Sequence, residues 1–337
     1  MTCYNPTTIY LRKSFPINKP DEDTLHELNT PKFSYRKNYY EVKVPCGKCE
    51  GCKLDHANEW ATRIFCEMKY HKEACFVTLT YNNEKLPIND KGYPTLKKRD
   101  VQLFFKRLSK KYPNIRKLYC GEMGPKTHRP HYHCIILGYK PKDLKVYKTN
   151  HKEQILWKSK ELQKIWGKGF VVIGDCNYET ACYVARYVQK KAGIEKRQTE
   201  YYYDIFGKKR RKYIKVNETG QEPEFIEMSR KPGIGYQYWQ DNKELIKQQN
   251  GILVKCNDKI ILKKLPRYYK KLWEAENWEE YHQNKYNQCK KAEQQIQNIL
   301  DQISIEASDD KKWEWYINNQ KESIEFKAKL LKRTNII

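Results

Sequence analysis

Three short segments, at residues 75–81, 117–122 and 131–138, constrain the fold of this chain more than any other feature. Each is rich in apolar and β-forming residues, and each has the length of a strand rather than of a helix. A Gly-Pro break at Gly124 separates the second segment from the third. We therefore expect a buried strand at 75–81, and an antiparallel hairpin formed by 117–122 and 131–138 around a basic loop.

Segments with helical spacing of apolar residues alternate with these strands. The expected helices are residues 53–70, 99–111, 151–166 and 178–191, and one further strand is expected at 170–173. Helices interspersed among strands in this order predict an α+β layer structure, in which helices pack on a sheet.

The charge of the chain indicates a polyanionic partner. It has 66 Lys and Arg against 41 Asp and Glu, a formal net charge of +25. Each Lys or Arg that contacts a phosphate releases condensed counterions, so nucleic acid is the expected partner. The sequence has no run of about 20 apolar residues and no secretory signal, so we expect no membrane association and a location in the compartment of synthesis.

A cysteine-rich element follows the first 45 residues, which contain several prolines and are expected to form an extended arm with little regular structure. Cys46, Cys49 and Cys52 form C-x2-C-x2-C, which predicts a structural zinc site in preference to free thiols. The fourth ligand could come from Cys3 or His56. An iron–sulfur cluster is disfavoured because the fourth Cys and the following Pro are missing.

His131 and His133 are two residues apart in an expected strand, so their side chains project from the same face. Such a pair is often only structural. If the hairpin forms, however, Glu122 on its first strand approaches both imidazoles. Two imidazoles and a carboxylate leave open positions on a divalent cation, which suits Mg²⁺ or Mn²⁺, and Zn²⁺ tolerates the same ligands.

Tyr183 and Tyr187 are four residues apart in an expected helix and therefore share a face. The chain has 27 Tyr, so a pair of core residues is the simpler alternative. Arg186, Lys190 and Lys191 lie in the same segment and could bind phosphate. Cations near a phenol favour the phenolate, the nucleophilic form. Two adjacent phenols allow two successive strand transfers.

Further DNA contacts are expected from basic residues in two other regions. Lys126 and Arg129 lie in the loop before the histidines, and residues 201–213 interleave Tyr with Lys and Arg. Aromatic faces between cations are typical of single-stranded DNA binding, although charged runs are more often solvated surface.

The pattern along the chain predicts three regions. Residues 1–56 form the arm with the Cys cluster, residues 57–245 form the catalytic domain, and residues 246–337 form a charged, mainly helical C-terminal region.

Several motifs resemble a known superfamily in both sequence and order. The segments 75–81, 131–133 and 183–190 resemble the three ordered motifs of HUH endonucleases, in the two-tyrosine branch of rolling-circle initiators. More narrowly, four segments resemble the replication initiation proteins of microviruses, especially of the gokushovirus group. These segments are residues 44–52, 120–124, 129–133 and 228–235. The resemblance spans roughly residues 1–240 and leaves the tail outside.

The resemblance implies a small antiparallel sheet flanked by helices, with the histidines on a central strand. It implies that His131 and His133 bind a metal ion, with Glu122 as a more variable third ligand, and that Tyr183 and Tyr187 are nucleophiles. One tyrosine would nick the origin and remain linked to the 5′ phosphate, and the second would allow the ends to be rejoined after a round of replication.

The expected function is therefore initiation of rolling-circle replication by a metal-dependent, site-specific single-strand endonuclease with strand-transfer activity. Expected partners are single-stranded origin DNA and a host helicase and polymerase, in the cytoplasm of an infected bacterial cell. An HUH transposase or relaxase is the nearest alternative. A non-catalytic nucleic-acid-binding protein, with structural histidines and a zinc knuckle, is the alternative from another class.

Overall fold

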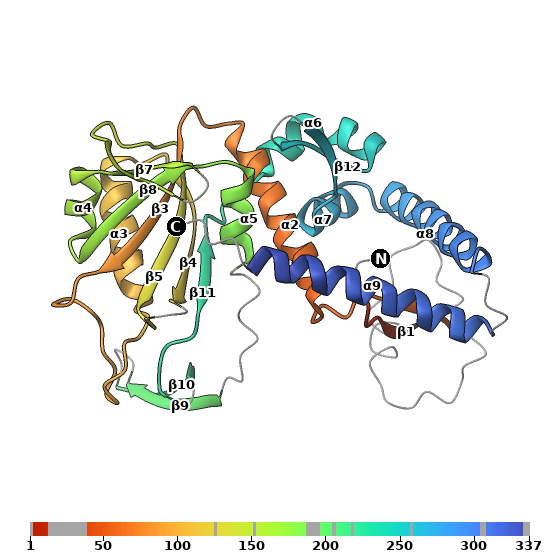
Figure 1. Cartoon of the computed structure of the whole chain (residues 1–337), viewed down its shortest axis with the longest axis horizontal. Helices are drawn as coiled ribbons and strands as arrows, with labels where there is room; N and C mark the ends of the chain where they lie inside the picture. The colour runs from red at the N-terminus through yellow and green to blue at the C-terminus, as the bar shows by residue number, and fades with distance from the viewer. Residues whose placement is uncertain are drawn as a thin grey trace. The chain divides into compact units, whose positions relative to one another are not determined.

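The computed structural model describes residues 3–12, 39–124, 127–150, 153–186, 196–203, 207–216, 219–256, 259–303 and 308–332 (Figure 1). The chain divides into two compact units. Residues 1–55 and 265–335 belong to the first unit, and residues 56–264 belong to the second. The three predicted regions remain predictions, because compactness does not test whether a region folds independently.

A seven-stranded antiparallel sheet is the centre of the second unit, with the strand order β11-β4-β5-β3-β8-β7-β6. The strands are β3 (Ala74–Tyr81), β4 (Arg116–Met123), β5 (Pro130–Leu137), β6 (Lys145–Thr149), β7 (Ile155–Lys158), β8 (Gly169–Asp175) and β11 (Phe225–Met228). The α+β class, the three expected strands and the antiparallel hairpin of β4 with β5 are confirmed. The strand β5, which carries both histidines, lies inside the sheet between β4 and β3.

The register of the central strands places polar residues opposite the histidines. Glu122 of β4 pairs with His131, and Thr78 of β3 pairs with His133. Directly paired residues project from the same face of a sheet. Glu122, Thr78 and the two histidines therefore lie on one face, as the hairpin prediction required for Glu122.

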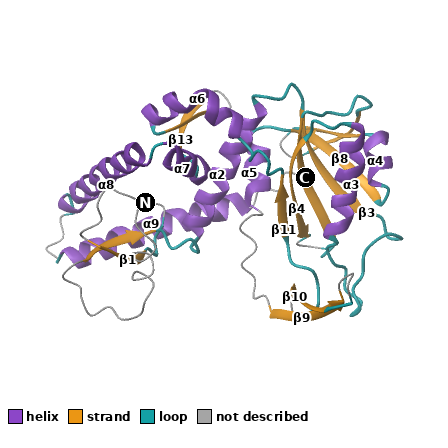
Figure 2. Ribbon diagram, turned by 180° about the vertical axis from the view of Figure 1, so that it is seen from behind, coloured by secondary structure: helices purple, strands orange, loops and turns teal. Residues whose placement is uncertain are grey.

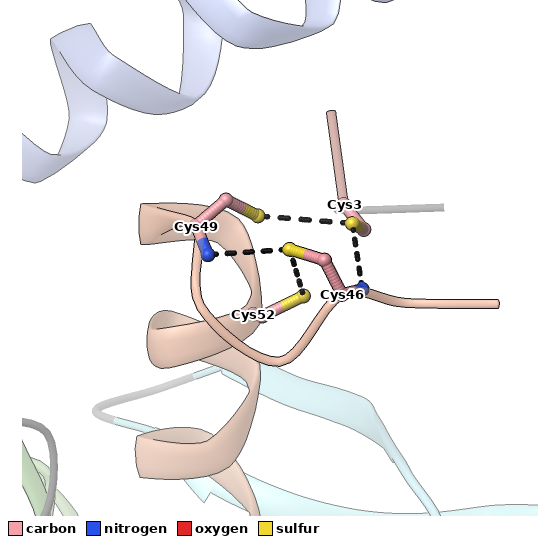
Figure 3. A group of neighbouring side chains, drawn as sticks. All are labelled: Cys3, Cys46, Cys49 and Cys52. Atoms are coloured by element: carbon pink, nitrogen blue, oxygen red, sulfur yellow. Dashed lines mark hydrogen bonds between the residues drawn. The ribbon is translucent and has the colours of Figure 1, made fainter. Parts of the chain in front are cut away.

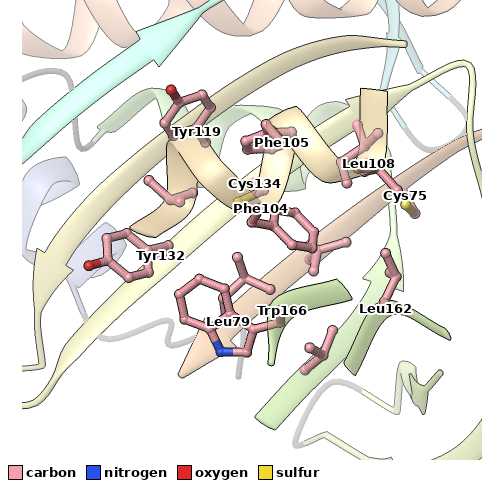
Figure 4. Packing of buried hydrophobic residues seen from close by; sticks show 14 of the residues in the cluster. Cys75, Leu79, Phe104, Phe105, Leu108, Tyr119, Tyr132, Cys134, Leu162 and Trp166 are labelled. Atoms are coloured by element: carbon pink, nitrogen blue, oxygen red, sulfur yellow. The ribbon is translucent and has the colours of Figure 1, made fainter. Parts of the chain in front are cut away.

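The opposite face carries the hydrophobic core (Figure 4). Helices α3 (Lys98–Lys111) and α4 (Lys160–Trp166) cover it, and Phe104, Phe105 and Trp166 are fully buried there against Leu79 and Cys134 of the strands. Figure 2 shows α3 and α4 on one side of the sheet and α5 on the other. The sheet thus separates its apolar packing face from the histidine face.

Tyr132, the residue between the two histidines, points into this core. Its ring is fully buried, its hydroxyl accepts a hydrogen bond from the backbone N–H of Lys97 at 2.9 Å, and the hydroxyl of Tyr81 lies 2.9 Å away. The predicted orientation of Tyr132, away from the histidines, is confirmed. Burial raises its pKa to about 12, so the phenol stays neutral in the core.

Truncation of a ring in this core is expected to lower stability strongly. Phe104→Ala removes a fully buried phenyl ring between the sheet and α4, and we expect a loss of about 3–5 kcal/mol in the free energy of unfolding. Urea denaturation measures the change. Phe170→Ala is the matched control, because the Phe170 side chain is 54% exposed, and equal losses in the two variants would contradict this assignment of the core.

The histidine face is approached by α5 (Tyr178–Arg186), which also contacts α2 (Glu50–Met68) through an edge-to-face pair of Tyr178 and Phe65 at 6.1 Å. The helix begins after Asn177, whose side-chain oxygen accepts the backbone N–H of Thr180 at 2.9 Å. In return, the Thr180 hydroxyl accepts the backbone N–H of Asn177 at 2.8 Å. This reciprocal cap fixes where the helix starts. The predicted helix extended to residue 191, and residues 187–191 lie outside the described part of the chain.

The predicted helix at 151–166 is wrong in its first half. Residues 155–158 form β7, which pairs with β6 and β8, and α4 begins only after Ser159. The Ser159 hydroxyl accepts the backbone N–H of Leu162 at 3.1 Å, and Asp143 accepts the backbone N–H of Glu161 at 3.0 Å. These two caps stop the helix from extending backwards, and the β-forming residues before Ser159 pair with the sheet instead.

The expectation of an arm with little regular structure is wrong for two segments of the first unit. β1 (Thr7–Arg12) and β2 (Tyr39–Val44) form an antiparallel pair. Both segments are rich in β-branched and aromatic residues, which outweigh the nearby prolines. Residues 13–38 lie outside the described part.

The remaining elements are helices and two hairpins. They are β9 (Lys196–Tyr203), β10 (Lys209–Val216), α6 (Tyr236–Gln249), β12 (Gly251–Cys256), β13 (Lys259–Lys264), α7 (Arg267–Glu276), α8 (Trp278–Asp301) and α9 (Asp309–Lys332). The expected helical tail is confirmed, and β12 with β13 adds a hairpin at the start of the predicted C-terminal region. No helix in the described part of the chain has the length and the apolar character needed to cross a bilayer.

Candidate functional site

Glu122 and His133 form the buried centre of the candidate site. The carboxylate Oε1 of Glu122 lies 3.5 Å from Nε2 of His133, and the two side chains are 5% and 3% exposed. Burying a carboxylate is unfavourable unless a hydrogen-bond donor or a cation stays close to it. The pair therefore provides a strong attraction for positive charge on this face of the sheet.

The orientation of the His133 ring is fixed by its neighbours on β3. The hydroxyl of Thr78 lies 3.1 Å from Nδ1, and the ring of Phe76 stacks on the imidazole at 5.8 Å with an interplanar angle of 8°. These contacts direct Nε2 towards Glu122. If Nδ1 carries the proton and donates it to Thr78, the lone pair of Nε2 is available to a ligand.

His131 presents a second imidazole next to the first, with 6.4 Å between the ring centroids of His131 and His133. Its Nδ1 atom is buried and has no hydrogen-bond partner within the described part of the chain. Burial lowers the pKa of His131, which favours the neutral imidazole, the form that binds metal ions.

Gly124 lets the His131 ring lie against the backbone. A Cβ atom on Gly124 would lie only 2.9 Å from Nε2 of His131 and 3.3 Å from the carbonyl oxygen of Arg129. Any larger residue would therefore displace the imidazole. The sequence indicated only a chain break at this position, and the close approach emerges from the folded hairpin.

The sulfur atoms of four cysteines gather more closely than the ligand atoms of the histidine site. In the described residues, Cys3, Cys46, Cys49 and Cys52 are the group whose potential ligand atoms all lie within 4.8 Å of one another. For Glu122 and both histidines to hold one ion, the His131 ring has to turn towards His133, whose ring plane is at 86° to its own.

Tyr183 of α5 lies directly against the histidine site. Its ring meets the His133 imidazole edge-to-face, with 5.3 Å between centroids, and it meets Phe76 edge-to-face at 6.1 Å. The side chain is partly exposed. The structure thus brings one of the two predicted nucleophiles beside one of the two predicted metal ligands, which are 50 residues apart in the sequence.

Several predicted residues lie outside what the structure describes. They are Tyr187, Lys190, Lys191 and Lys126, together with the side chain of Arg186 and most side chains of residues 201–213. Arg129 is described, and its guanidinium donates a hydrogen bond to the backbone oxygen of Tyr81 at 3.0 Å. That bond gives Arg129 a role in holding β3 to the loop before β5, and its contact with DNA remains a prediction.

Sequence reasoning missed Thr78 and Phe76 as parts of the site. Both residues lie within the apolar run at 75–81, where the only signal was strand character. The alternation of a strand places residues 76, 78 and 80 on one face, so the register to β5 would have identified them. That register joins residues 55 positions apart and is set by the tertiary structure.

Comparison with known proteins identifies the family. Residues 74–192, which contain the sheet strands β3 to β8 and α5, match the family model of the replication-associated protein ORF2. No solved structure matches the chain.

Three phage proteins are similar to the chain over a longer or different extent. The replication-associated protein ORF2 of Spiroplasma virus 4 is 32% identical over 292 residues, which cover 84% of this chain and 83% of that protein. The replication-associated protein VP4 of Bdellovibrio phage phiMH2K is 33% identical over 178 residues, covering 50% and 55%. ORF4 of Chlamydia phage 1, also a replication-associated protein, is 32% identical over 168 residues, covering 45% and 41%. With a similar protein matched over most of both lengths, and the histidine face inside the matched segment, the chain belongs to the replication-associated protein ORF2 family, as a replication initiator of the microvirus type.

Proposed function

We propose that this protein nicks single-stranded DNA at an origin of rolling-circle replication through a 5′-phosphotyrosine intermediate, and rejoins the ends after each round. The observation that supports this most strongly is the packing of Tyr183 against His133, on the sheet face that also carries Glu122. A phenol, two imidazoles and a carboxylate at one place are the groups that a metal-dependent transesterification of phosphate needs.

In the proposed first step, the phenolic oxygen of a tyrosine attacks a phosphorus atom of the DNA backbone. The new bond joins this oxygen to phosphorus, the bond from phosphorus to the 3′ oxygen breaks, and the departing 3′ oxygen takes up a proton as the phenol loses its own. The product is a 5′-phosphotyrosine and a 3′ hydroxyl. Because one phosphate ester replaces another, the step is readily reversible, and attack by a 3′ hydroxyl rejoins the strand.

His131, His133 and Glu122 fit the binding of a divalent cation. The donor set is two imidazoles and one carboxylate, His131 has a buried Nδ1 without a hydrogen-bond partner in the described part, and burial keeps its imidazole neutral. When bound, Mg²⁺ or Mn²⁺ supplies Lewis-acid polarisation of a phosphate oxygen. Thr78 and Phe76 hold the His133 ring in position, and Gly124 leaves room for His131.

The charge of the chain supports DNA as the substrate. A formal charge of +25 favours a polyanion and predicts binding that weakens as the salt concentration rises. As a replication protein of a phage it would act in the infected bacterial cell, where a host polymerase extends the 3′ hydroxyl and a host helicase unwinds the duplex.

The experiment that tests this function is incubation of the purified chain with end-labelled single-stranded DNA from its own genome, with Mn²⁺ and with EDTA. Denaturing electrophoresis should show a shortened labelled strand and a slowly migrating protein–DNA band, both lost with EDTA. DNA binding without either product, under every divalent cation tried, would favour the non-catalytic binding protein.

Removal of the Thr78 hydroxyl is expected to weaken cation binding without removing a ligand. Thr78→Val keeps the shape of the side chain but leaves Nδ1 of His133 without its hydroxyl partner, so His133 is held less firmly. We expect the Mn²⁺ concentration for half-maximal nicking to rise about 10–100-fold.

Thr80→Val is the control for this variant. Thr80 lies two residues along the same strand, and its hydroxyl donates to the backbone oxygen of Phe170 at 3.4 Å instead. An Mn²⁺ requirement that changes equally in both variants would contradict the positioning role of Thr78.

A further inference from the structure

A second group of potential metal ligands lies in the first compact unit, outside the segment matched by the family (Figure 3). Cys46 follows β2, Cys49 directly precedes α2, and Cys52 is in the first turn of that helix. Cys3, which is 2% exposed, comes from the other end of the first unit and completes the group. The four sulfur atoms lie within 4.8 Å of one another.

The spacing of these sulfur atoms suits a tetrahedral metal ion. The Sγ atoms of Cys49 and Cys3 are 3.7 Å apart, and those of Cys46 and Cys52 are 4.0 Å apart. A zinc–sulfur bond of about 2.3 Å gives a regular tetrahedron with edges of about 3.8 Å. All four residues are free cysteines, and their separations are nearly twice the disulfide bond length of about 2.0 Å.

The backbone around the cluster is arranged to stabilise thiolates. The N–H groups of Lys48 and Cys49 donate to Sγ of Cys46 at 3.4 and 3.3 Å, and the N–H of Cys46 donates to Sγ of Cys3 at 3.3 Å. Gly47, with φ of +72°, provides the left-handed turn that lets the backbone fold back over the sulfur. Hydrogen bonds from N–H groups favour the charged form of an acceptor, and thiolate is the form that binds metals.

We propose that Cys3, Cys46, Cys49 and Cys52 hold a structural Zn²⁺ ion. Four thiolates select a soft or borderline ion, unlike the imidazole and carboxylate ligands of the histidine site. Four protein ligands also leave no open position for a substrate, which is the arrangement of a structural site. The sequence left Cys3 and His56 as alternatives for the fourth ligand, and the geometry points to Cys3.

The ion would join two parts of the chain that are distant in sequence. Cys3 precedes β1 and lies 43 residues before Cys46, so the site closes a long loop and fixes both ends of the β1–β2 pair to the start of α2. Closing a loop of this length in the unfolded chain costs entropy, so the zinc site stabilises the fold of the first unit.

The test begins with the full-length wild-type protein, purified without chelator. Elemental analysis should find about one zinc ion per chain, and X-ray absorption at the zinc edge should show four sulfur neighbours at about 2.3 Å. Three sulfur atoms and one nitrogen would overturn the assignment of Cys3. Protein without bound zinc, also after incubation with Zn²⁺ under reducing conditions, or protein containing iron and inorganic sulfide, would overturn the zinc site itself.

Variants provide a second, independent comparison. Cys3→Ser and Cys49→Ser should lose tightly bound zinc, whereas His56→Ala and the exposed Cys289→Ser should retain it. Retention by Cys3→Ser together with loss by His56→Ala would overturn the proposed ligand set. Since His133→Ala should keep its zinc, the outcome is separable from any result on nicking.

Discussion

The double variant Tyr183→Phe, Tyr187→Phe is expected to form no detectable covalent adduct with DNA. Each substitution removes only a hydroxyl, so the Tyr183 ring can keep its packing against His133 and Phe76. Removing the nucleophile of a covalent enzyme typically costs several orders of magnitude in rate, and we expect a decrease in nicking of at least about 10³-fold. Quantitative denaturing electrophoresis of labelled DNA measures it.

Binding to single-stranded DNA, followed by fluorescence anisotropy, is the control for the double variant and should change less than about threefold, since no phosphate-binding cation is removed. The single variants show which tyrosine attacks first. Loss of the initial adduct in only one of them identifies that residue as the first nucleophile. Undiminished adduct in the double variant would show that another residue attacks, and would contradict the proposed mechanism.

His133→Ala is expected to produce the second largest loss. It removes the imidazole that lies 3.5 Å from Glu122 and stacks on Phe76, and thereby a central ligand of the proposed cation site. A well-placed group that stabilises transition-state charge contributes about 10²–10³-fold to rate, so we expect at least a 10²-fold decrease. The initial rate of nicking at saturating Mn²⁺ measures the effect.

The control for His133→Ala is His128→Ala, which removes an exposed imidazole from the loop between β4 and β5. It should nick DNA at close to the wild-type rate. Because His133→Ala leaves the Glu122 carboxylate buried beside a cavity, its thermal unfolding has to be compared as well. A folded His133→Ala protein with wild-type nicking and an unchanged Mn²⁺ requirement would make the histidine structural.

Local patterns predicted the centre of the fold well. The strands at 75–81, 117–122 and 131–138 were identifiable because each is a short apolar run between turn residues. The pairing of Glu122 with His131 also followed from sequence, since a hairpin joins neighbouring segments and its loop sets the register. The side of the sheet reached by Tyr132 followed from simple alternation.

Contacts between distant segments were beyond this reasoning. The support of His133 by Thr78 and Phe76 depends on which strands become neighbours, and local periodicity carries no information about that choice. The choice of Cys3 over His56 likewise depends on where the start of the chain folds. The helix expected at 151–166 failed for a local reason, because the cap at Ser159 outweighed the apolar spacing before it.

Peptide mass spectrometry of the protein–DNA adduct tests the central claim most directly. The adduct formed with Mn²⁺ is isolated under denaturing conditions, digested with nuclease and protease, and searched for a residue that carries a nucleotide phosphate. The account predicts a nucleotide linked through its 5′ phosphate to Tyr183 or Tyr187, with a free 3′ hydroxyl on the other DNA fragment. Cleavage that leaves both fragments free of protein would show that water is the nucleophile and would contradict the account.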